Sequence, residues 1–207
     1  ADSALGSRYL SRPDAHTLVV AGAGGLAPWL VRGHCIARSG IKRVLIWNRT
    51  AEKAHQLEQA LSDEGIPAET IDDLEQAVRQ GDIVSTATMS KEPIIKGGWL
   101  KDGAHLDLVG GYAPDTREAD DAAISGHKLF VDCMESALDG VGDILNPLER
   151  GVIAKSDICG DLFDLAWGTV AGRESDGDIT VFKNAGGAHL DLMVARALIE
   201  RLEQKAS

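Results

Sequence analysis

A glycine-rich turn between a short apolar strand and a helix constrains this fold more than any other feature of the sequence. The segment VVAGAGGLAPWL has the spacing GxGxxA, directly after the strand residues Leu18–Ala21. In such a turn Gly22 permits the tight bend and Gly24 lets the backbone approach a pyrophosphate, while the small Ala27 allows the helix to pack on the strand. The order of strand, glycine turn and helix therefore predicts a site for a dinucleotide.

The helix after this turn can supply the positive charge that a phosphate needs. Its first N–H groups have no acceptor inside the helix, and its dipole is positive at this end. Pro28 lies in its first turn, where the missing N–H costs little. A glycine turn that binds nothing is the alternative, and the strand and helix on either side favour the cofactor site.

Short β-rich runs alternate with helical stretches along the chain, which predicts a parallel sheet with helices on both faces. The expected strands are Thr17–Ala21, Arg43–Trp47, Ala68–Ile71, Asp82–Thr86, His105–Val109 and Leu129–Asp132. The expected helices between them are Leu26–Arg38, Ala51–Ser62 and Asp73–Gln80. The predicted fold class is α/β, with a Rossmann-type, doubly wound and mainly parallel sheet.

Both ends of the chain depart from this alternation. Residues 1–13 are expected to form a helix that stops before Pro13. Near the other end, a polar turn is followed by a strand, ITVF, and by a helix at about Gly187–Gln204. The strand either extends the sheet or belongs to another domain. We predict a dinucleotide-binding domain at residues 14–172 and expect that the terminal segments, 1–13 and 173–207, lead to a second domain that is partly absent from this sequence.

The end of the second strand bears on which dinucleotide is bound. Folds that bind NAD place an acidic residue there, about 20 residues beyond the glycines, to hold the ribose hydroxyls. Here the strand ends in VLIWNRT, so that Asn48 takes this position, before Arg49 and Thr50 and one turn ahead of Lys53. Asn48 can hydrogen-bond a 2′-phosphate, and Arg49 can stack on adenine or bind the phosphate oxygens. A helix cap at Thr50 and a solvated charge at Arg49 are the alternatives, and the chemistry favours NADP(H).

Two further strand ends should complete this site, because ligands of such sheets bind at the carboxyl ends of the strands. The fourth strand ends in Thr86-Ala87-Thr88 and the fifth in Val109-Gly110-Gly111. Hydroxyls and glycines there suit a nicotinamide ribose, although the two glycines also fit a plain turn. The predicted cofactor residues are Gly22, Ala23, Gly24, Gly25, Leu26, Asn48, Arg49, Thr50, Lys53, Thr86, Ala87, Thr88, Val109 and Gly110.

Charge and composition exclude several classes of protein. A net charge of −11 argues against a nucleic-acid partner, because phosphate neutralisation needs a basic face. No apolar run approaches the ~20 residues that span a bilayer, and a secretory leader is not recognisable, so we expect a cytoplasmic protein with no membrane partner. The three cysteines are far apart and lack zinc spacing. Glu135, Asp139 and Asp143 fit helix and turn caps better than a metal site, and we predict no metal.

Segments beyond the glycine turn resemble one family. They are IWNRTAEKA (46–54), DIVSTATMSKEPII (82–95), GGWLKDGAHLDLVGGYAPDTREADDAAI (97–124), VDCMESALDGVGDIL (131–145) and FKNAGGAHLDLMVARAL (182–198). In this order they resemble the ornithine cyclodeaminase/mu-crystallin family over nearly the whole chain. The IWNRT form is similar to the NADPH-binding branch, which includes mu-crystallin and the cyclic ketimine reductases. The shikimate dehydrogenase group shares GAGG and NRT but does not account for DGVGDIL and FKNAGGAHLDL.

The chain departs from this family in two ways. Members are longer, with an N-terminal half-domain that supplies most substrate-binding cations and the dimer interface. We therefore expect a homodimer of the longer form and name no catalytic residue here. Ornithine cyclodeaminases carry an Asp after the glycine pair, where this chain has Tyr112, a poor base at neutral pH. Pro114, Asp115, Arg117 and Glu118 match the family pattern, and a turn with salt bridges explains them equally well.

The resemblance implies NADPH-dependent reduction of a small cyclic imino acid, such as pyrroline- or piperideine-2-carboxylate. An amino-acid dehydrogenase, an ornithine cyclodeaminase and a ligand-binding protein similar to mu-crystallin are the alternatives. His189 is the one histidine expected near the nicotinamide, although packing is its plainer role. We also expect the closing helix to expose apolar side chains and the chain to self-associate through them.

Overall fold

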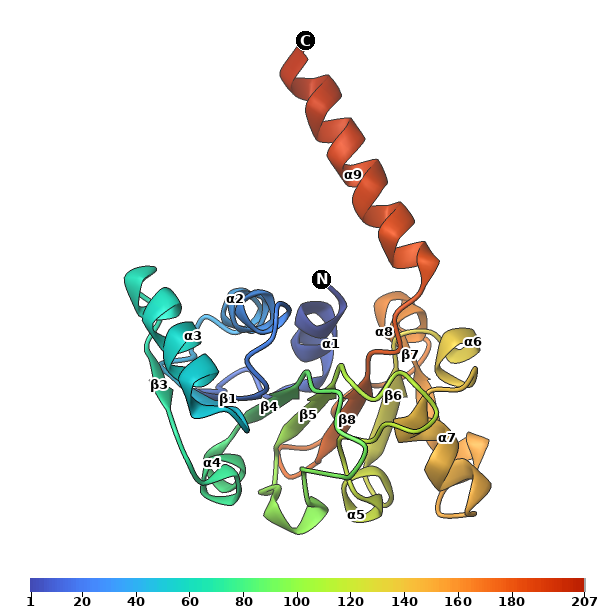
Figure 1. Ribbon diagram of the computed structural model, residues 1–207. Helices are drawn as coiled ribbons and strands as arrows, with labels where there is room; N and C mark the ends of the chain where they lie inside the picture. Colours follow the sequence, from blue (N-terminus) through green and yellow to red (C-terminus); the bar gives the residue numbers. More distant parts are fainter. Residues whose placement is uncertain (207) are drawn as a thin grey trace.

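The computed structural model describes residues 1–206, apart from the side chains of His189 and Ala206, and its strands form one eight-stranded sheet (Figure 1). The strands are β1 (Thr17–Ala21), β2 (Arg43–Trp47), β3 (Ala68–Thr70), β4 (Ile83–Thr86), β5 (His105–Leu108), β6 (Lys128–Val131), β7 (Ile158–Asp161) and β8 (Thr180–Lys183). Their order across the sheet is β3-β2-β1-β4-β5-β8-β6-β7, and neighbouring strands are parallel. The order reverses between β1 and β4, where doubly wound sheets bind their ligands.

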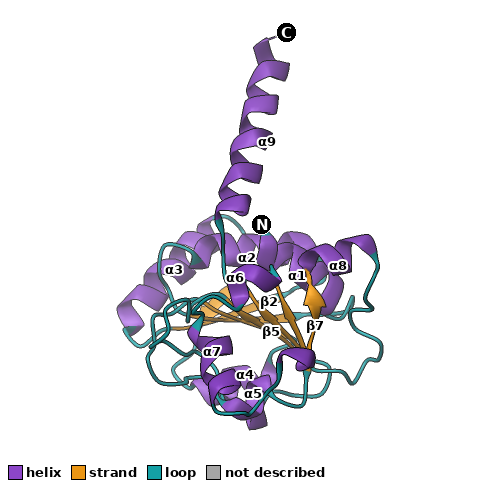
Figure 2. Ribbon diagram, turned by 90° about the vertical axis from the view of Figure 1, so that its right-hand side faces the viewer, coloured by secondary structure: helices purple, strands orange, loops and turns teal. Residues whose placement is uncertain are grey.

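Helices cover both faces of this sheet. The helices of the described chain are α1 (Asp2–Leu10), α2 (Ala27–Ala37), α3 (Ala51–Asp63), α4 (Leu74–Gln80), α5 (Asp121–Ile124), α6 (Met134–Ala137), α7 (Gly142–Glu149), α8 (Leu162–Trp167) and α9 (Ala188–Ala206), with 3₁₀ turns η1 (Gly97–Trp99) and η2 (Lys155–Asp157), and all but α9 lie beside the sheet (Figure 1). Helices α1, α2, α3 and α8 lie on one face, and α4 and α5 lie on the other (Figure 2). This layering confirms the predicted α/β, Rossmann-type fold.

The central strands are apolar throughout because both of their faces are covered. Successive side chains of a strand point to opposite faces. In β1, Leu18 and Val20 pack with Val31 of α2 on one face, and Val19 packs with Val78 of α4 on the other. All five of these side chains are fully buried. Each such burial stabilises the fold by about 1.5–3 kcal/mol, which fixes the sheet on which the site is built.

The predicted strand ITVF belongs to the sheet. Strand β8 lies between β5 and β6 and pairs with both, so that the last strand in the sequence is inserted next to the middle of the sheet. Of the two alternatives left open by the sequence, the structure thus shows that this strand extends the sheet. Strand β7, with the sequence ICGD, was not predicted, because a short strand containing Gly and Asp carries little β signal.

The closing helix projects away from the rest of the chain (Figure 1). More than half of each of the side chains of Leu192, Met193, Leu198 and Leu202 is exposed, which confirms the exposed apolar surface that the sequence predicts for α9. In the part of the chain that the structure describes, no helix is both long and apolar enough to cross a membrane.

Candidate dinucleotide-binding site

The turn after β1 bends because Gly22 adopts a conformation that side chains disfavour. Its φ is +112°, and a Cβ atom at this position would lie 2.7 Å from the carbonyl oxygen of Ala87. The Gly22 N–H donates to the carbonyl of Trp47 at 2.8 Å. The turn is therefore fixed between the ends of β2 and β4, and it leads the chain into α2 at the switch point of the sheet.

Gly24 and the start of α2 form an open cradle of amide groups. A Cβ atom added at Gly24 would meet no atom within 4 Å. Among the described residues, the N–H groups of Gly24, Gly25 and Leu26 have no hydrogen-bond acceptor. Free N–H groups at a helix start are the donors that bind a pyrophosphate. The geometry thus fits the dinucleotide site that the sequence predicts.

Asn48 joins the turn after β1 to the turn after β2. Its Oδ1 accepts from the N–H of Ala23 at 3.1 Å, and its Nδ2 donates to the carbonyl of Thr50 at 2.8 Å. A hydrogen bond from Asn48 to the ligand was predicted, but these two bonds leave only one amide hydrogen for that purpose. Arg49 is exposed and has no hydrogen bond or ion pair within the described chain, so its guanidinium is free to bind a phosphate.

A cavity of about 270 Å³ lies over these two turns and the end of β4. The predicted residues that line it are Gly22, Ala23, Gly24, Asn48, Arg49, Thr50, Lys53, Ala87 and Thr88. Trp47, Met89, Ser90 and Ile94, which were not predicted, complete its wall. We call this cavity the adenosine-side cavity, because it contains the end of β2, where such folds bind the adenosine ribose.

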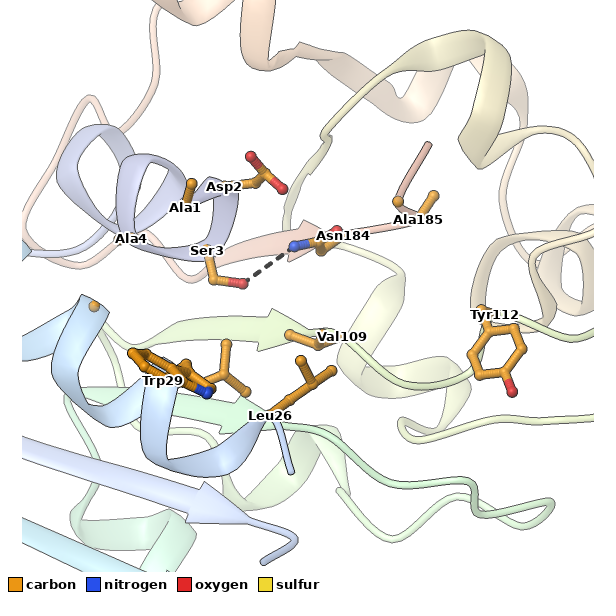
Figure 3. Close-up of a pocket in the computed structure, with 13 residues that line it drawn as sticks. Ala1, Asp2, Ser3, Ala4, Leu26, Trp29, Val109, Tyr112, Asn184 and Ala185 are labelled. Carbon is orange, nitrogen blue, oxygen red and sulfur yellow. Dashed lines mark hydrogen bonds between the residues drawn. The ribbon is translucent and has the colours of Figure 1, made fainter. Parts of the chain in front are cut away.

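A second cavity, of about 360 Å³, lies on the other side of the glycine turn (Figure 3). Two predicted residues, Leu26 and Val109, line it, together with Trp29 of α2 and Tyr112. The Nδ2 of Asn184, just beyond β8, donates to the Ser3 hydroxyl across the cavity wall at 3.3 Å. We call it the nicotinamide-side cavity, because the ends of β5 and β8 contribute to it.

Three of the predicted cofactor residues, Gly25, Thr86 and Gly110, line neither cavity. Gly25 is exposed in the glycine turn, whereas Thr86 and Gly110 are buried. The Thr86 hydroxyl donates to the carboxylate of Glu118 at 2.7 Å, and the carbonyl of Gly110 accepts from the ammonium of Lys183. In this structure both residues therefore contact buried charges of the protein and lie beneath the site.

Sequence reasoning missed these buried charges. Glu118, Asp143 and Lys183 are fully buried, and the sequence analysis assigned the two carboxylates to turns, caps or salt bridges. Burial raises the pKa of the Glu118 carboxyl; Lys183 opposes this rise and Asp143 adds to it. A lysine at the end of the otherwise apolar strand TVFK was the one available signal, because lysine is almost never fully buried without a partner.

Neighbouring residues of the same segment form ion pairs, one exposed at Asp115 and one in which Arg117 is buried. Asp115 pairs with Lys91 at 2.7 Å, and Arg117 pairs with Asp121 at 3.0 Å, as expected for a turn with salt bridges. The side chain of His189 lies outside the described residues. Within the described residues, no group of three or more His, Cys, Asp or Glu is arranged to hold a metal ion.

The parallel sheet, the glycine turn at its switch point and the free amides of α2 define a Rossmann-type fold with the arrangement that such folds use to bind dinucleotides. The chain belongs to the ornithine cyclodeaminase/mu-crystallin family, whose model matches residues 1–206.

Relatives with known names share both sequence and fold with the chain. A Delta(1)-pyrroline-2-carboxylate reductase of Paracoccus denitrificans is 45% identical over 197 residues, which are 94% of this chain and 62% of the relative. The structure of the Delta(1)-pyrroline-2-carboxylate reductase of Thermococcus litoralis, in complex with NADH and L-proline, matches with a TM-score of 0.94 and 32% identity, over 99% of this chain and 63% of that one. An archaeal alanine dehydrogenase dimer with bound NAD matches with a TM-score of 0.92 and 27% identity, over 99% and 63%. The chain thus spans about three fifths of the length of these relatives.

Proposed function

We propose that the protein is an NADPH-dependent reductase of a small cyclic imino acid, of the pyrroline- or piperideine-2-carboxylate kind, and that this chain contains its cofactor domain. The observation that carries the proposal is the open amide cradle of Gly24, Gly25 and Leu26, in a chain 45% identical to a pyrroline-2-carboxylate reductase. Residues 14–172 together with β8, which lies in the same sheet, would form the cofactor domain, with the remaining terminal segments leading to a substrate domain. A homodimer is part of the proposal, as the archaeal alanine dehydrogenase is described as a dimer.

The end of β2 supports NADPH as the cofactor. An acidic residue would repel a 2′-phosphate, and the strand instead ends in Asn48 and Arg49. Arg49, Thr50 and Lys53 are all exposed and line the adenosine-side cavity. The cations of Arg49 and Lys53 can donate charge-assisted hydrogen bonds to a phosphate, and the uncharged amide of Asn48 does not repel it. The reductase of Thermococcus litoralis is described with NADH and the alanine dehydrogenase with NAD, so the choice of cofactor is tested by comparing the affinities of this chain for NADPH and NADH.

The chain's own contribution to the reaction would be binding and orientation. When bound, the nicotinamide would supply a hydride to the carbon of the substrate's C=N bond, and the nitrogen would take up a proton from water. The free amides of α2 would hold the pyrophosphate, and Arg49 with Lys53 would hold the 2′-phosphate. Apolar walls at Leu26 and Val109 would exclude water from the nicotinamide-side cavity.

Tyr112 favours reduction over the deamination of ornithine. Its side chain is 56% exposed at the nicotinamide-side cavity, in the position where ornithine cyclodeaminases carry an Asp. A phenol is a poor base and does not replace the carboxylate that deamination requires. Reduction of a ready-made imine involves no loss of an α-proton or of an amine, so it needs no such base.

The decisive assay follows NADPH consumption by a protein of the relatives' length that contains this chain. We expect oxidation of NADPH with pyrroline- or piperideine-2-carboxylate, and no formation of proline and ammonia from ornithine. Turnover of ornithine would replace the proposal with a cyclodeaminase, and oxidation of alanine would replace it with an amino-acid dehydrogenase. Tight binding of NADPH without turnover of any of these substrates would indicate a ligand-binding protein instead.

A further inference from the structure

The ends of β4 and β5 rest on a cluster of three buried charges that the predicted function does not use. Its members are Glu118, in the segment before α5, Asp143 in α7 and Lys183 at the end of β8, and each is fully buried. We call them the buried charge cluster. They come from distant parts of the sequence and meet beneath the edge of the sheet that faces the nicotinamide-side cavity.

Glu118 holds the end of β4. Its Oε1 accepts from the N–H of Thr88 at 2.6 Å and from the Thr88 hydroxyl at 2.8 Å, and its Oε2 accepts from the Thr86 hydroxyl at 2.7 Å. A carboxylate that accepts three hydrogen bonds fixes the positions of its donors in a way that packing alone does not. These bonds hold the backbone of residues 86–88 in a fixed position beside the glycine turn, where Ala87 contacts Gly22.

Asp143 and Lys183 hold the end of β5. The ammonium of Lys183 donates to the carbonyl of Gly110 and lies 3.2 Å from Oδ2 of Asp143. The other carboxylate oxygen of Asp143 accepts from the N–H of Glu118 at 2.8 Å, which links the two halves of the cluster.

The backbone approaches these charges too closely for any side chain to intervene. A Cβ atom at Gly110 would lie 2.6 Å from Oε1 of Glu118 and 1.9 Å from the carbonyl oxygen of Thr88. At Gly111, where φ is +60°, a Cβ atom would lie 2.1 Å from Oδ2 of Asp143. The turns after β4 and β5 therefore pack directly against the buried charge cluster.

We propose that Glu118, Asp143 and Lys183 are positioning residues that set the ends of β4 and β5, against which the dinucleotide would bind in the adenosine-side cavity and in the nicotinamide-side cavity respectively. They do not touch the ligand; they act through Thr88, Ala87 and Val109, which line the two cavities. This inference rests on the proposed binding of NADPH. It differs from a purely structural role, because it requires that NADPH, which would reach both strand ends, lose more affinity than a ligand that lacks the nicotinamide.

The test compares two ligands of the same chain: NADPH, and 2′-phospho-ADP-ribose, which lacks the nicotinamide. The ratio of their Kd values measures what the nicotinamide adds to binding. In Glu118→Ala we expect this ratio to fall toward one, a loss of about tenfold or more in NADPH affinity, because the charged hydrogen bonds that hold the strand ends are removed. The Kd of 2′-phospho-ADP-ribose should rise by clearly less than that of NADPH, and the fluorescence of bound NADPH should approach that of the free cofactor.

Glu118→Gln should restore the ratio to within about twofold of the unmodified chain. Its amide oxygen can still accept from Thr88, and its N–H₂ can donate to the Thr86 hydroxyl, which also accepts hydrogen bonds. This conservative variant separates the geometry of the cluster from its charge.

A matched pair of variants on β4 keeps the test valid if Glu118→Ala does not fold. Thr86→Val removes a hydroxyl that donates to Glu118 at 2.7 Å, and Ser85→Ala removes a neighbouring buried hydroxyl that donates to Asp107 at 2.7 Å. Only Thr86→Val should lower the ratio, although both variants should lower stability by a similar amount of about 1 kcal/mol.

Three results would overturn the proposal: equal losses for both ligands in Thr86→Val, an unchanged ratio in both Glu118→Ala and Thr86→Val, or a ratio of one in the unmodified chain. Failure of the unmodified chain to bind NADPH at all would instead remove the proposed function, and this inference with it.

Discussion

The two sides of the predicted dinucleotide site are built in different ways. The adenosine side contains the turns after β1 and β2, which Asn48 joins, with exposed cations at Arg49 and at Lys53 of α3. The nicotinamide side contains the end of β5, which contacts the buried Lys183, and the end of β4 between the two sides is held by the buried Glu118. One side thus presents charge to solvent and ligand, and the other keeps its charge inside the protein.

This difference predicts how each side responds to substitution. An exposed cation contributes little to the free energy of folding, so its removal should have a small effect on stability. Removal of one partner of a buried charge pair leaves an uncompensated charge, at a cost of about 3–5 kcal/mol. The adenosine side should therefore tolerate changes that alter ligand choice, whereas the nicotinamide side should not.

The largest expected effect lies in the glycine turn. Gly24→Val should weaken dinucleotide binding by about a hundredfold or more, because a branched side chain would fill the space that a pyrophosphate needs. The fold should be unaffected, since a Cβ atom there meets nothing within 4 Å. Gly98→Val is the matched control, because Gly98 is equally open but lies outside both cavities. Calorimetric titration and thermal melting would check both variants, and normal NADPH binding by a folded Gly24→Val would contradict the assigned site.

The other essential glycine of the turn should affect stability directly. Gly22→Ala should lower the free energy of unfolding by at least about 2 kcal/mol, because it combines a φ of +112° with a contact of 2.7 Å to the Ala87 carbonyl. The loss of stability in Gly22→Ala should appear without ligand, because Gly22 lies in the turn that connects the two sides of the site. Gly24→Val, in contrast, should lose ligand affinity and keep its stability. Urea denaturation of both variants would measure it, and equal stabilities would show that the turn has room to relax.

Buried polar groups extend along β5 away from the site, and they should make stability depend on pH. Burial lowers the pKa of His105 to about 3, although the nearby Asp107 opposes this. The unfolded chain binds a proton at this histidine below about pH 6.5, whereas the folded chain does not, so stability should fall as pH falls from about 6.5 toward 3. Between about pH 7 and 5 we expect His105 to account for about 2 kcal/mol of this loss.

A matched pair of histidine variants checks this value. His105→Gln should remove about 2 kcal/mol of the difference in unfolding free energy between pH 7 and 5. His55→Gln should leave that difference unchanged within about 0.5 kcal/mol, because the His55 side chain on α3 is 60% exposed. Urea denaturation at both pH values measures the two variants. An identical pH dependence in His105→Gln and the unmodified chain would show that His105 is not held neutral in the fold.

The same contrast explains what could be predicted from the sequence. The strands β1 and β2 and the glycine turn were predicted because their signals are local: apolar runs, glycines and a helix start within a few residues. The position of β8 between β5 and β6 was not predicted, since strand order depends on long-range packing. Thr86 was assigned to the ligand because its partner Glu118 is distant in sequence, and no local pattern identifies a buried carboxylate.

The smallest expected effect concerns ligand choice at the adenosine side. We expect the unmodified chain to bind NADPH at least about tenfold more tightly than NADH, a difference of about 1.4 kcal/mol that one charge-assisted contact can supply. Arg49→Ala should remove most of this preference and leave NADH affinity nearly unchanged, because Arg49 has no partner within the described chain whose loss would disturb the fold.

Arg43→Ala provides the control for charge alone. Arg43 lies at the opposite end of β2, where it pairs with Glu69 and donates to Gln80 at 2.7 Å. Both variants lower the positive charge of the chain by one, so a general electrostatic effect would weaken NADPH binding in both. A local phosphate site would weaken it only in Arg49→Ala, and added salt should reduce that difference. Equal affinities of the unmodified chain for NADPH and NADH would show that the end of β2 does not select the 2′-phosphate, and the exposed cations would then be surface charges only.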